Sequence, residues 1–347
     1  MLSYRHAFHA GNHADVFKHT LLVMLLERFN AKETPYTVID THAGSARYDL
    51  NDERAQKTLD AQSGILKLLE TARYVEAQSP DRGQPAPELS LISRDDLQPS
   101  HKSFAAAALR ELRSRECRSD FIDFQKYLLF AKVCLDTGFY PGSPEIERAF
   151  MRAKDCLILS ELHPDEIGAL QRNTRLNAAA TENAPAVHIH HRDGFEALRA
   201  LTPPKTKRGI VFCDPSYEDT SDWEKAATAL IETHKRWASA TLALWYPLVA
   251  VKKIERDAMK QKIIAEIKGG KTERGILDAL LCVNTENSHR ESALKDVKRS
   301  EPPRLYGSGM FVVNPPWKLD EKLGAVLPRL AEALGTDSAG SYKINNY

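Results

Sequence analysis

The stretch Gly209-Ile210-Val211-Phe212-Cys213, followed at once by Asp214-Pro215-Ser216-Tyr217, decides the fold. Its first five residues form a short apolar run, which is typical of a strand buried on both faces of a parallel sheet. Further short apolar or β-branched runs occur at residues 35–40, 156–159, 186–189, 241–245, 276–283 and 310–313. Because helical patterns lie between most of these runs, we predict an α/β fold in which a mostly parallel, seven-stranded sheet is covered by helices on both faces.

Around this sheet the sequence predicts an inserted helical subdomain and a long loop. A helix is expected over residues 13–28, where Asn12 can cap the first turn. Polar stretches at 78–100 and 284–304 are expected to be a flexible part of the insertion and a hairpin loop before an antiparallel last strand. We expect residues 1–50 and 136–335 to form the main domain, residues 51–135 the helical insertion, and residues 336–347 a C-terminal tail.

Composition excludes several classes of protein. The 347 residues are 42% hydrophobic and 27% charged, which is ordinary for a soluble globular chain. Lys+Arg number 48 and Asp+Glu 47, so any surface for nucleic acid must be a local patch. The five cysteines include no C-x-x-C pair, no run approaches the roughly 18 apolar residues of a membrane span, and the N-terminus lacks a signal-peptide core. We therefore expect a cytoplasmic protein without disulfides.

The turn that follows residues 209–213 suits methyl transfer to the exocyclic amine of a nucleobase. Such an amine is a poor nucleophile because its lone pair is delocalised into the ring. The Asp214 carboxylate and the Pro215 carbonyl can each accept one N–H, which frees the lone pair, and Tyr217 can stack on a base swung out of its helix. The alternative is an ordinary strand-end turn capped by an Asp.

The other predicted strand ends carry residues that suit S-adenosylmethionine as cofactor. Ligands of open α/β sheets bind at the carboxyl ends of the strands. Here the first strand ends in a loop with Gly44, which lets a backbone approach the amino-acid end of the cofactor. Glu161 ends the second strand and can bind both ribose hydroxyls, and Asp193 after the third can face the adenine amine. The full G-x-G-x-x-G of NAD sites is absent.

Three further features of the sequence have competing interpretations. Asn314-Pro315-Pro316-Trp317 also matches an amino-methyltransferase tetrapeptide, but it follows the last strand, so we interpret it as a structural turn. The basic runs at 110–118 and 252–271, like Lys205, Lys207 and Arg208, can contact phosphates or simply form solvated surface. Four of the twelve histidines lie in the first nineteen residues, but no cysteine or acid cluster completes a metal site, so we predict no metal.

Several motifs together resemble the bacterial 23S ribosomal RNA adenine-N6 methyltransferases of the RlmJ type. They are Ser3-Tyr4-Arg5-His6-Ala7-Phe8-His9-Ala10-Gly11-Asn12-His13-Ala14-Asp15-Val16 with Lys18-His19, Asp40-Thr41-His42-Ala43-Gly44, Tyr140-Pro141-Gly142-Ser143-Pro144, Glu161-Leu162-His163-Pro164, Ala243-Leu244-Trp245-Tyr246-Pro247 and Asn314-Pro315-Pro316-Trp317-Lys318-Leu319. The resemblance spans nearly the whole chain.

This resemblance implies a Rossmann-like class I methyltransferase fold and N6-methylation of an adenine equivalent to adenine 2030 of 23S rRNA. It implies that the chain acts as a monomer on rRNA before full subunit assembly, without metal or membrane. It places cofactor contacts at His19, His42, Ser143, Glu161, Asp193 and Gly194, makes Asp214 both cofactor-adjacent and catalytic, and places Tyr4 against the RNA.

The chain departs from the family pattern at two points. The usual tetrapeptide has a second proline where this chain has Ser216, and the stretches 78–100 and 284–304 make it longer than a typical member. The acceptor carbonyl belongs to Pro215, so we expect the chemistry to be retained.

The N-terminal segment, residues 4–19, is expected to be a working part of the site. Tyr4 can stack on a nucleotide beside the target, Arg5 can meet a phosphate, and His19 can reach the cofactor. Two other functions stay open on the sequence alone. One is DNA adenine-N6 methylation, against which the absence of a DNA-reading domain counts. The other is a noncatalytic RNA-binding or ribosome-assembly factor that has kept the fold.

Overall fold

The protein was analysed as a computed structural model that describes residues 5–78, 121–178, 184–269, 275–286, 305–336 and 338–347. The stretches 78–100 and 284–304, and Tyr4, therefore lie wholly or mostly outside the described residues, as does the basic run at 110–118.

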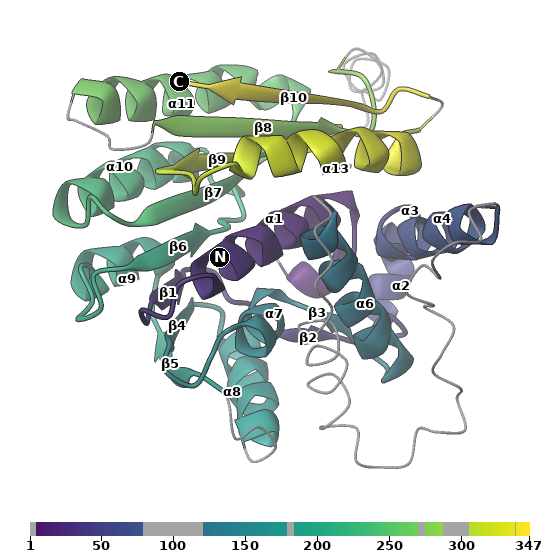
Figure 1. Cartoon of the computed structure of the whole chain (residues 1–347), viewed down its shortest axis with the longest axis horizontal. Helices are drawn as coiled ribbons and strands as arrows, with labels where there is room; N and C mark the ends of the chain where they lie inside the picture. Colours follow the sequence, from purple (N-terminus) through teal and green to yellow (C-terminus); the bar gives the residue numbers. More distant parts are fainter. Residues whose placement is uncertain (1–4, 79–120, 179–183, 270–274, 287–304, 337) are drawn as a thin grey trace.

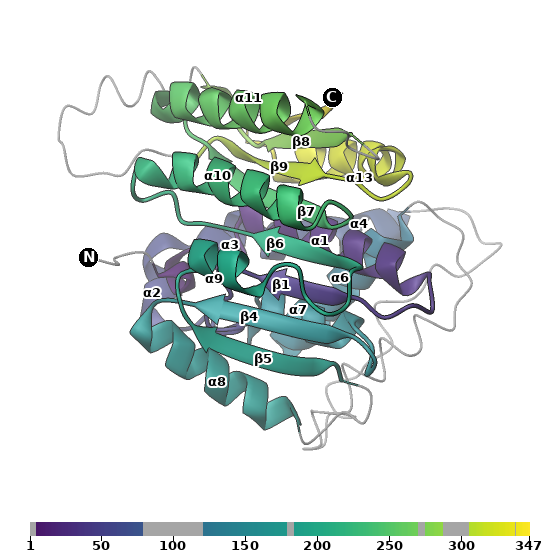
Figure 2. The same ribbon diagram turned by 90° about the vertical axis from the view of Figure 1, so that its left-hand side faces the viewer.

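An eight-stranded sheet forms the centre of the molecule, with strand order β10-β8-β9-β7-β6-β1-β4-β5. Five neighbouring strands are parallel: β1 (Thr37–Asp40), β4 (Cys156–Glu161), β5 (Ala186–His191), β6 (Gly209–Cys213) and β7 (Thr241–Leu248). The last three are joined by antiparallel pairing: β8 (Ile276–Cys282), β9 (Gly307–Val313) and β10 (Ser341–Asn346). Because the five parallel strands share one direction, their carboxyl ends lie together along the same end of the sheet (Figure 2).

Helices cover both faces of this sheet, as predicted. One layer holds α9 (Gly194–Leu201), α10 (Ser221–Arg236) and α11 (Lys253–Gly269), in front of the strands in Figure 2. The opposite layer holds α1 (His13–Asn30), α4 (Ile65–Gln78), α6 (Ile122–Asp136), α7 (Ser143–Phe150), α8 (Pro164–Ala178) and α13 (Leu319–Leu334), several of which surround α1 in Figure 1. The remaining short elements are η1 (His6–Phe8), the ribbon of β2 (Arg47–Tyr48) and β3 (Tyr140–Pro141), α2 (Glu53–Thr58), α3 (Asp60–Ser63) and η3 (Ala250–Lys252).

Helix α1 crosses the centre of its layer and is buried on almost every side. Its first turn is capped as predicted, since the Asn12 Oδ1 accepts a hydrogen bond of 2.9 Å from the Asp15 N–H. All residues from 14 to 26 are buried, which includes the polar side chains of Asp15, Lys18 and His19. Because a buried charge needs a partner, these side chains indicate where the site lies.

The sheet has eight strands rather than the seven that we expected. The additional strand, β10, lies within residues 336–347, which we had expected to be a tail, and it pairs with β8. Its sequence, Ser-Tyr-Lys-Ile-Asn-Asn, is mostly polar because the strand is at the edge of the sheet and largely exposed. An exposed edge strand shows little apolar pattern, so the search for apolar runs did not indicate β10.

Candidate active site

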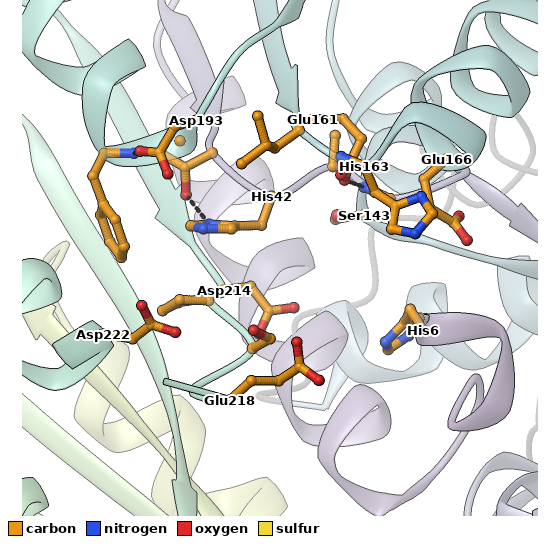
Figure 3. Close-up of a pocket in the computed structure, with 18 of the residues that line it drawn as sticks. His6, His42, Ser143, Glu161, His163, Glu166, Asp193, Asp214, Glu218 and Asp222 are labelled. Atoms are coloured by element: carbon orange, nitrogen blue, oxygen red, sulfur yellow. Dashed lines mark hydrogen bonds between the residues drawn. The ribbon is translucent and has the colours of Figure 1, made fainter. Parts of the chain in front are cut away.

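A cavity of about 720 Å³ opens at the carboxyl ends of the parallel strands, within the range of about 300–1,000 Å³ that is common for ligand sites. The loops after β1, β4, β5 and β6 form its wall, together with Lys18 and His19 of α1. Figure 3 shows Asp193, His42 and Asp214, which come from three different strand ends, around this space. The site therefore lies where the strand order of an α/β sheet predicts it.

Most of the predicted site residues line this one cavity. They are His19, His42, Ser143, Glu161, Asp193, Gly194, Asp214 and Pro215. Gly194 is required at its position, because a Cβ there would come within 2.2 Å of the Thr41 carbonyl oxygen. The glycine thus lets α9 begin against the first loop. Arg5 does not line the cavity; it is an exposed residue that forms an ion pair of 2.8 Å with Asp165.

Glu161 is held in place by two backbone amides. Its Oε2 accepts a hydrogen bond of 2.8 Å from the Gly44 N–H, and its Oε1 accepts one of 2.7 Å from the His163 N–H. Each carboxylate oxygen can accept a second hydrogen bond. The carboxylate is therefore fixed in orientation and still able to receive two hydroxyl groups from a ligand in the cavity, which is the geometry that a ribose requires.

Asp40, at the end of β1, anchors two of the predicted cofactor residues from below the cavity. Its Oδ2 accepts a hydrogen bond of 2.7 Å from the Ser143 hydroxyl, and its Oδ1 one of 3.1 Å from the His42 N–H. The side chain is fully buried, and burial raises its pKa to about 7, although these hydrogen bonds favour the charged form. Burial, followed by the charge of Asp40, raises the pKa of Glu147 well above its usual range. The two acids thus resist carrying two negative charges at once.

The raised pKa of Asp40 predicts a specific dependence of stability on pH. Between its unfolded pKa near 4 and its folded pKa of about 7 the native state holds a proton that the unfolded state has lost, so this group's contribution to stability is lost as pH rises through that window. Asp40→Asn removes the titration. The unfolding free energy of the wild type, relative to the variant, should therefore fall between pH 4.5 and 8, on the order of 1–4 kcal/mol.

Urea unfolding of both proteins across this pH range measures the difference. Asp136→Asn, at an exposed carboxylate with 45% of its side-chain surface accessible, is the matched control. If the curves of wild type and Asp40→Asn run parallel while the control behaves like wild type, the assigned pKa of Asp40 is wrong.

Lys18 is the site residue whose role the sequence did not indicate. Its Nζ contacts the Asp214 Oδ2 and lies 2.9 Å from the Asp15 Oδ1, so one buried cation joins two acids. The Asp15 Oδ2 in turn meets the His6 Nε2 at 2.9 Å and accepts a hydrogen bond from the Gly11 N–H. Burial would raise the pKa of Asp15, but His6 and Lys18 together hold it well below its usual range. The network thus places an ionised carboxylate and a cation behind Asp214.

Tyr217 does not line the cavity, contrary to the stacking role that we expected. Its side chain is buried, its ring centroid lies 4.2 Å from that of Trp223, and its hydroxyl donates a hydrogen bond of 2.9 Å to the Trp245 carbonyl. Its φ is +55°, in the left-handed region. In this conformation the ring of Tyr217 packs on Trp223, and the Trp245 carbonyl is the hydrogen-bond partner that a buried phenol requires.

His19 lines the floor of the cavity as a neutral side chain. Burial lowers its pKa to about 3, although Asp15 favours the protonated form. Its Nδ1 lies 2.9 Å from the hydroxyl of Tyr140, which is itself 3.1 Å from the hydroxyl of Tyr127. Its buried location fits a hydrogen-bonding contact for a ligand and does not fit a cation for phosphate.

Comparison with known proteins decides which family has this arrangement. The family model described as "Ribosomal RNA large subunit methyltransferase D, RlmJ" matches residues 33–79 and 122–346. The chain belongs to this family. It is 31% identical over 345 residues to "Ribosomal RNA large subunit methyltransferase J" of Escherichia coli (strain K12), a match that covers 99% of this chain and 98% of the relative. It is 30% identical over 350 residues to the protein of the same name in Haemophilus influenzae, with the same coverage.

A solved structure confirms the fold of this family member. Protein LPL1258 from Legionella pneumophila superposes with a TM-score of 0.66 at 24% sequence identity, over 97% of this chain and 98% of that chain.

The second amino-methyltransferase tetrapeptide lies beside the amino ends of the parallel strands, opposite the end that carries the cavity. Asn314 follows β9, which is antiparallel to β7, so it lies beside the start of β7 and away from Asp214. Its amide donates hydrogen bonds of 2.6 Å and 3.0 Å to the carbonyls of Ala238 and Ala240. Asn314 therefore forms a structural turn in this member of the methyltransferase family, as we expected.

The described ranges hold neither a cluster of metal-binding side chains nor a membrane-spanning helix. There, no three His, Cys, Asp or Glu side chains gather in a group that could hold a metal ion. Within the same ranges, no helix is both long enough and apolar enough to cross a membrane.

Proposed function

We propose that the chain transfers a methyl group from S-adenosylmethionine to the N6 amine of an adenine in 23S rRNA. One observation carries the proposal: the Asp214-Pro215 turn lines the same cavity as the pre-oriented carboxylate of Glu161. The cavity therefore combines an acceptor suited to an amine with an acceptor suited to a ribose. The family name, which specifies large-subunit ribosomal RNA, supports the substrate.

The residues around the cavity fit this cofactor. Glu161 would accept the two ribose hydroxyls, while Asp193 would face the adenine amine with the oxygen that does not cap α9. Ser143 and His42, both anchored on Asp40, and neutral His19 would hold the amino-acid end. When bound, S-adenosylmethionine supplies the activated methyl group.

Asp214 and Pro215 would prepare the target amine for the transfer. Lys18 occupies the Oδ2 of Asp214, so the Oδ1 is the atom that can accept one N6–H, and the Pro215 carbonyl can accept the other. These two hydrogen bonds draw the nitrogen toward a tetrahedral shape and free its lone pair. Positive charge then develops on the nitrogen, which the ionised Asp214 stabilises, and Asp214 can accept the departing proton.

The remaining features of the proposal concern the RNA. Tyr4 and Arg5 are proposed RNA contacts, and Arg5 would exchange its exposed partner Asp165 for a phosphate. The chain would act as a monomer. The base must be swung out of its helix to reach Asp214. This requirement favours rRNA that is not yet fully assembled as the substrate. The protein would then act in the cytoplasm.

Replacing Glu161 tests the cofactor part of the proposal. Glu161→Ala should weaken S-adenosylmethionine binding by about 1.5–3 kcal/mol, the range for hydrogen bonds to a charged group. Glu161→Gln keeps one acceptor oxygen and should lie between the variant and wild type. Titration calorimetry measures both, with the melting temperature as the check on folding. A folded Glu161→Ala protein with wild-type affinity would remove Glu161 from the cofactor site.

Methyl transfer to three nucleic acids tests the function itself. Purified protein and tritiated S-adenosylmethionine are incubated with protein-free 23S rRNA, with assembled large subunits and with duplex DNA containing the same sequence. We expect label in protein-free rRNA, recovered as N6-methyladenosine. Label in DNA alone would indicate a DNA methyltransferase, and RNA binding without label would indicate a noncatalytic assembly factor; either outcome contradicts the proposal.

A further inference from the structure

Ser216 carries two hydrogen-bond donors and lines the cavity. It lies between Pro215 and Tyr217, is half-buried and lines the cavity wall. Among the described residues neither its backbone N–H nor its hydroxyl has a hydrogen-bond partner. A polar residue inside a built site with both donors unused is available to a ligand.

The turn around Ser216 is held from both sides, so these donors have a fixed place. Pro215 precedes it and restricts the backbone. Tyr217 follows it, with a ring packed 4.2 Å from Trp223 and a hydroxyl bonded to the Trp245 carbonyl. Ser216 is therefore supported by a buried neighbour on each side and does not need to be ordered when a ligand arrives.

The chemistry of the target base identifies what these donors can meet. In adenine the N6 amine is flanked by two ring nitrogens, N1 and N7, both of which are acceptors. Ser216 is the next residue of the turn whose Asp214 and Pro215 would accept the two N6–H groups, so it is the neighbour closest in sequence to the ring edge beside N6. We propose that Ser216 donates a hydrogen bond to N1 or N7 of the target adenine and thereby positions the base for transfer.

This inference rests on the proposed function and deepens it. Ser216 would be a positioning residue, because it contacts the base and not the reacting nitrogen. It also gives the serine at this position a role that a proline lacks, since proline has neither an N–H nor a hydroxyl. Because N1 and N7 are the acceptors beside N6, replacing each of them separately in the RNA distinguishes the two possible partners.

Single-atom changes in the RNA, combined with variants of Ser216, test the inference. The substrate is a synthetic rRNA fragment that the wild-type protein methylates, carrying adenosine, 1-deazaadenosine or 7-deazaadenosine at the target. Ser216→Ala removes the hydroxyl and keeps the N–H, and Ser216→Pro removes both. Ser239→Ala, whose hydroxyl donates to the Lys207 carbonyl away from the cavity, controls for handling. The readout is kcat/KM at saturating cofactor, with cofactor affinity measured separately.

We expect Ser216→Ala or Ser216→Pro to lower kcat/KM on adenosine about three- to ten-fold, the effect of one ordinary hydrogen bond, with cofactor affinity unchanged. One of the two deaza substrates should lower the kcat/KM of the wild type by a similar factor. The same substrate should lower the kcat/KM of the affected Ser216 variant no further. A loss in Ser216→Ala assigns the bond to the hydroxyl, and a loss only in Ser216→Pro assigns it to the N–H.

Two results would overturn the inference. In one, both Ser216 variants keep wild-type kcat/KM on adenosine; in the other, variant and wild type lose equal factors on both deaza substrates. A failure of the proposed function is seen separately, because the wild type would then methylate no unmodified fragment.

Discussion

Asp214→Asn should lower the turnover number for RNA methylation about 100-fold or more while the protein remains folded and binds its cofactor. The change keeps the shape of the side chain but removes the negative charge that stabilises the developing positive charge on N6. Lys18 contacts the Oδ2 of Asp214. The Oδ2 therefore cannot take over the role of the Oδ1 as acceptor for the amine. Single-turnover kinetics with saturating RNA and cofactor measure the loss.

The control for this variant is Asp219→Asn, which changes an exposed acid on the same cavity wall. It should keep turnover within about two-fold of wild type, since surface charges in water interact weakly. Near-normal turnover in Asp214→Asn would refute the catalytic assignment of this carboxylate, whatever the control does.

Lys18→Met should damage both stability and turnover. Lys18 is the buried cation between Asp15 and Asp214, with 6% of its side-chain surface exposed. Removing one partner of a buried ion pair typically costs about 3–5 kcal/mol, because the remaining charge stays buried and unpaired. Asp214 would also lose the contact that orients its second oxygen, so turnover should fall even under conditions in which the variant is fully folded.

Lys225→Met is the matched control, because Lys225 lines the same cavity but pairs with Asp222 at the surface, with 52% of its side chain exposed. It should cost at most about 1 kcal/mol. Urea unfolding and turnover are measured on both variants at one pH. Equal, small losses of unfolding free energy in the two variants would show that the Lys18 network does not hold the site together.

The layered sheet was predictable because its buried strands are continuous apolar runs. The runs at 209–213 and 276–283 correspond to β6 and β8 almost residue for residue. The shared direction of β4 and β5 places Glu161 and Asp193 at the same end of the sheet, because parallel strands end together. The edge strand β10 was missed because its side chains are polar and exposed.

Long-range packing explains what the sequence could not give about the site. The ion pair of Lys18 with Asp214 joins residues 196 positions apart, and nothing in either local pattern indicates it. We expected Tyr217 to stack on the base because it is the aromatic residue at the predicted turn. In the structure its ring packs on Trp223 and its hydroxyl donates to the Trp245 carbonyl, so its side chain is buried. The order of residues along a turn does not determine which side chain enters the cavity.

The N-terminal segment was expected to be a working part of the site, and several of its side chains line the cavity wall. They are His6, Lys18 and His19. Tyr4 lies outside the described residues, so its contact with RNA stays a prediction. Tyr4→Ala should cut methylation of RNA while cofactor affinity stays close to wild type, and a loss of stability with full activity would contradict it.

The central claim is tested most directly by mapping N6-methyladenosine in the 23S rRNA of cells with and without this protein. Nuclease digestion and mass spectrometry locate the modified residue, and cells that carry Asp214→Asn in place of the wild type provide the catalytic control. We expect one N6-methyladenosine in 23S rRNA that is absent from cells lacking the protein, is restored by the wild-type chain and is not restored by Asp214→Asn. An identical set of N6-methyladenosines in all of these cells would contradict it.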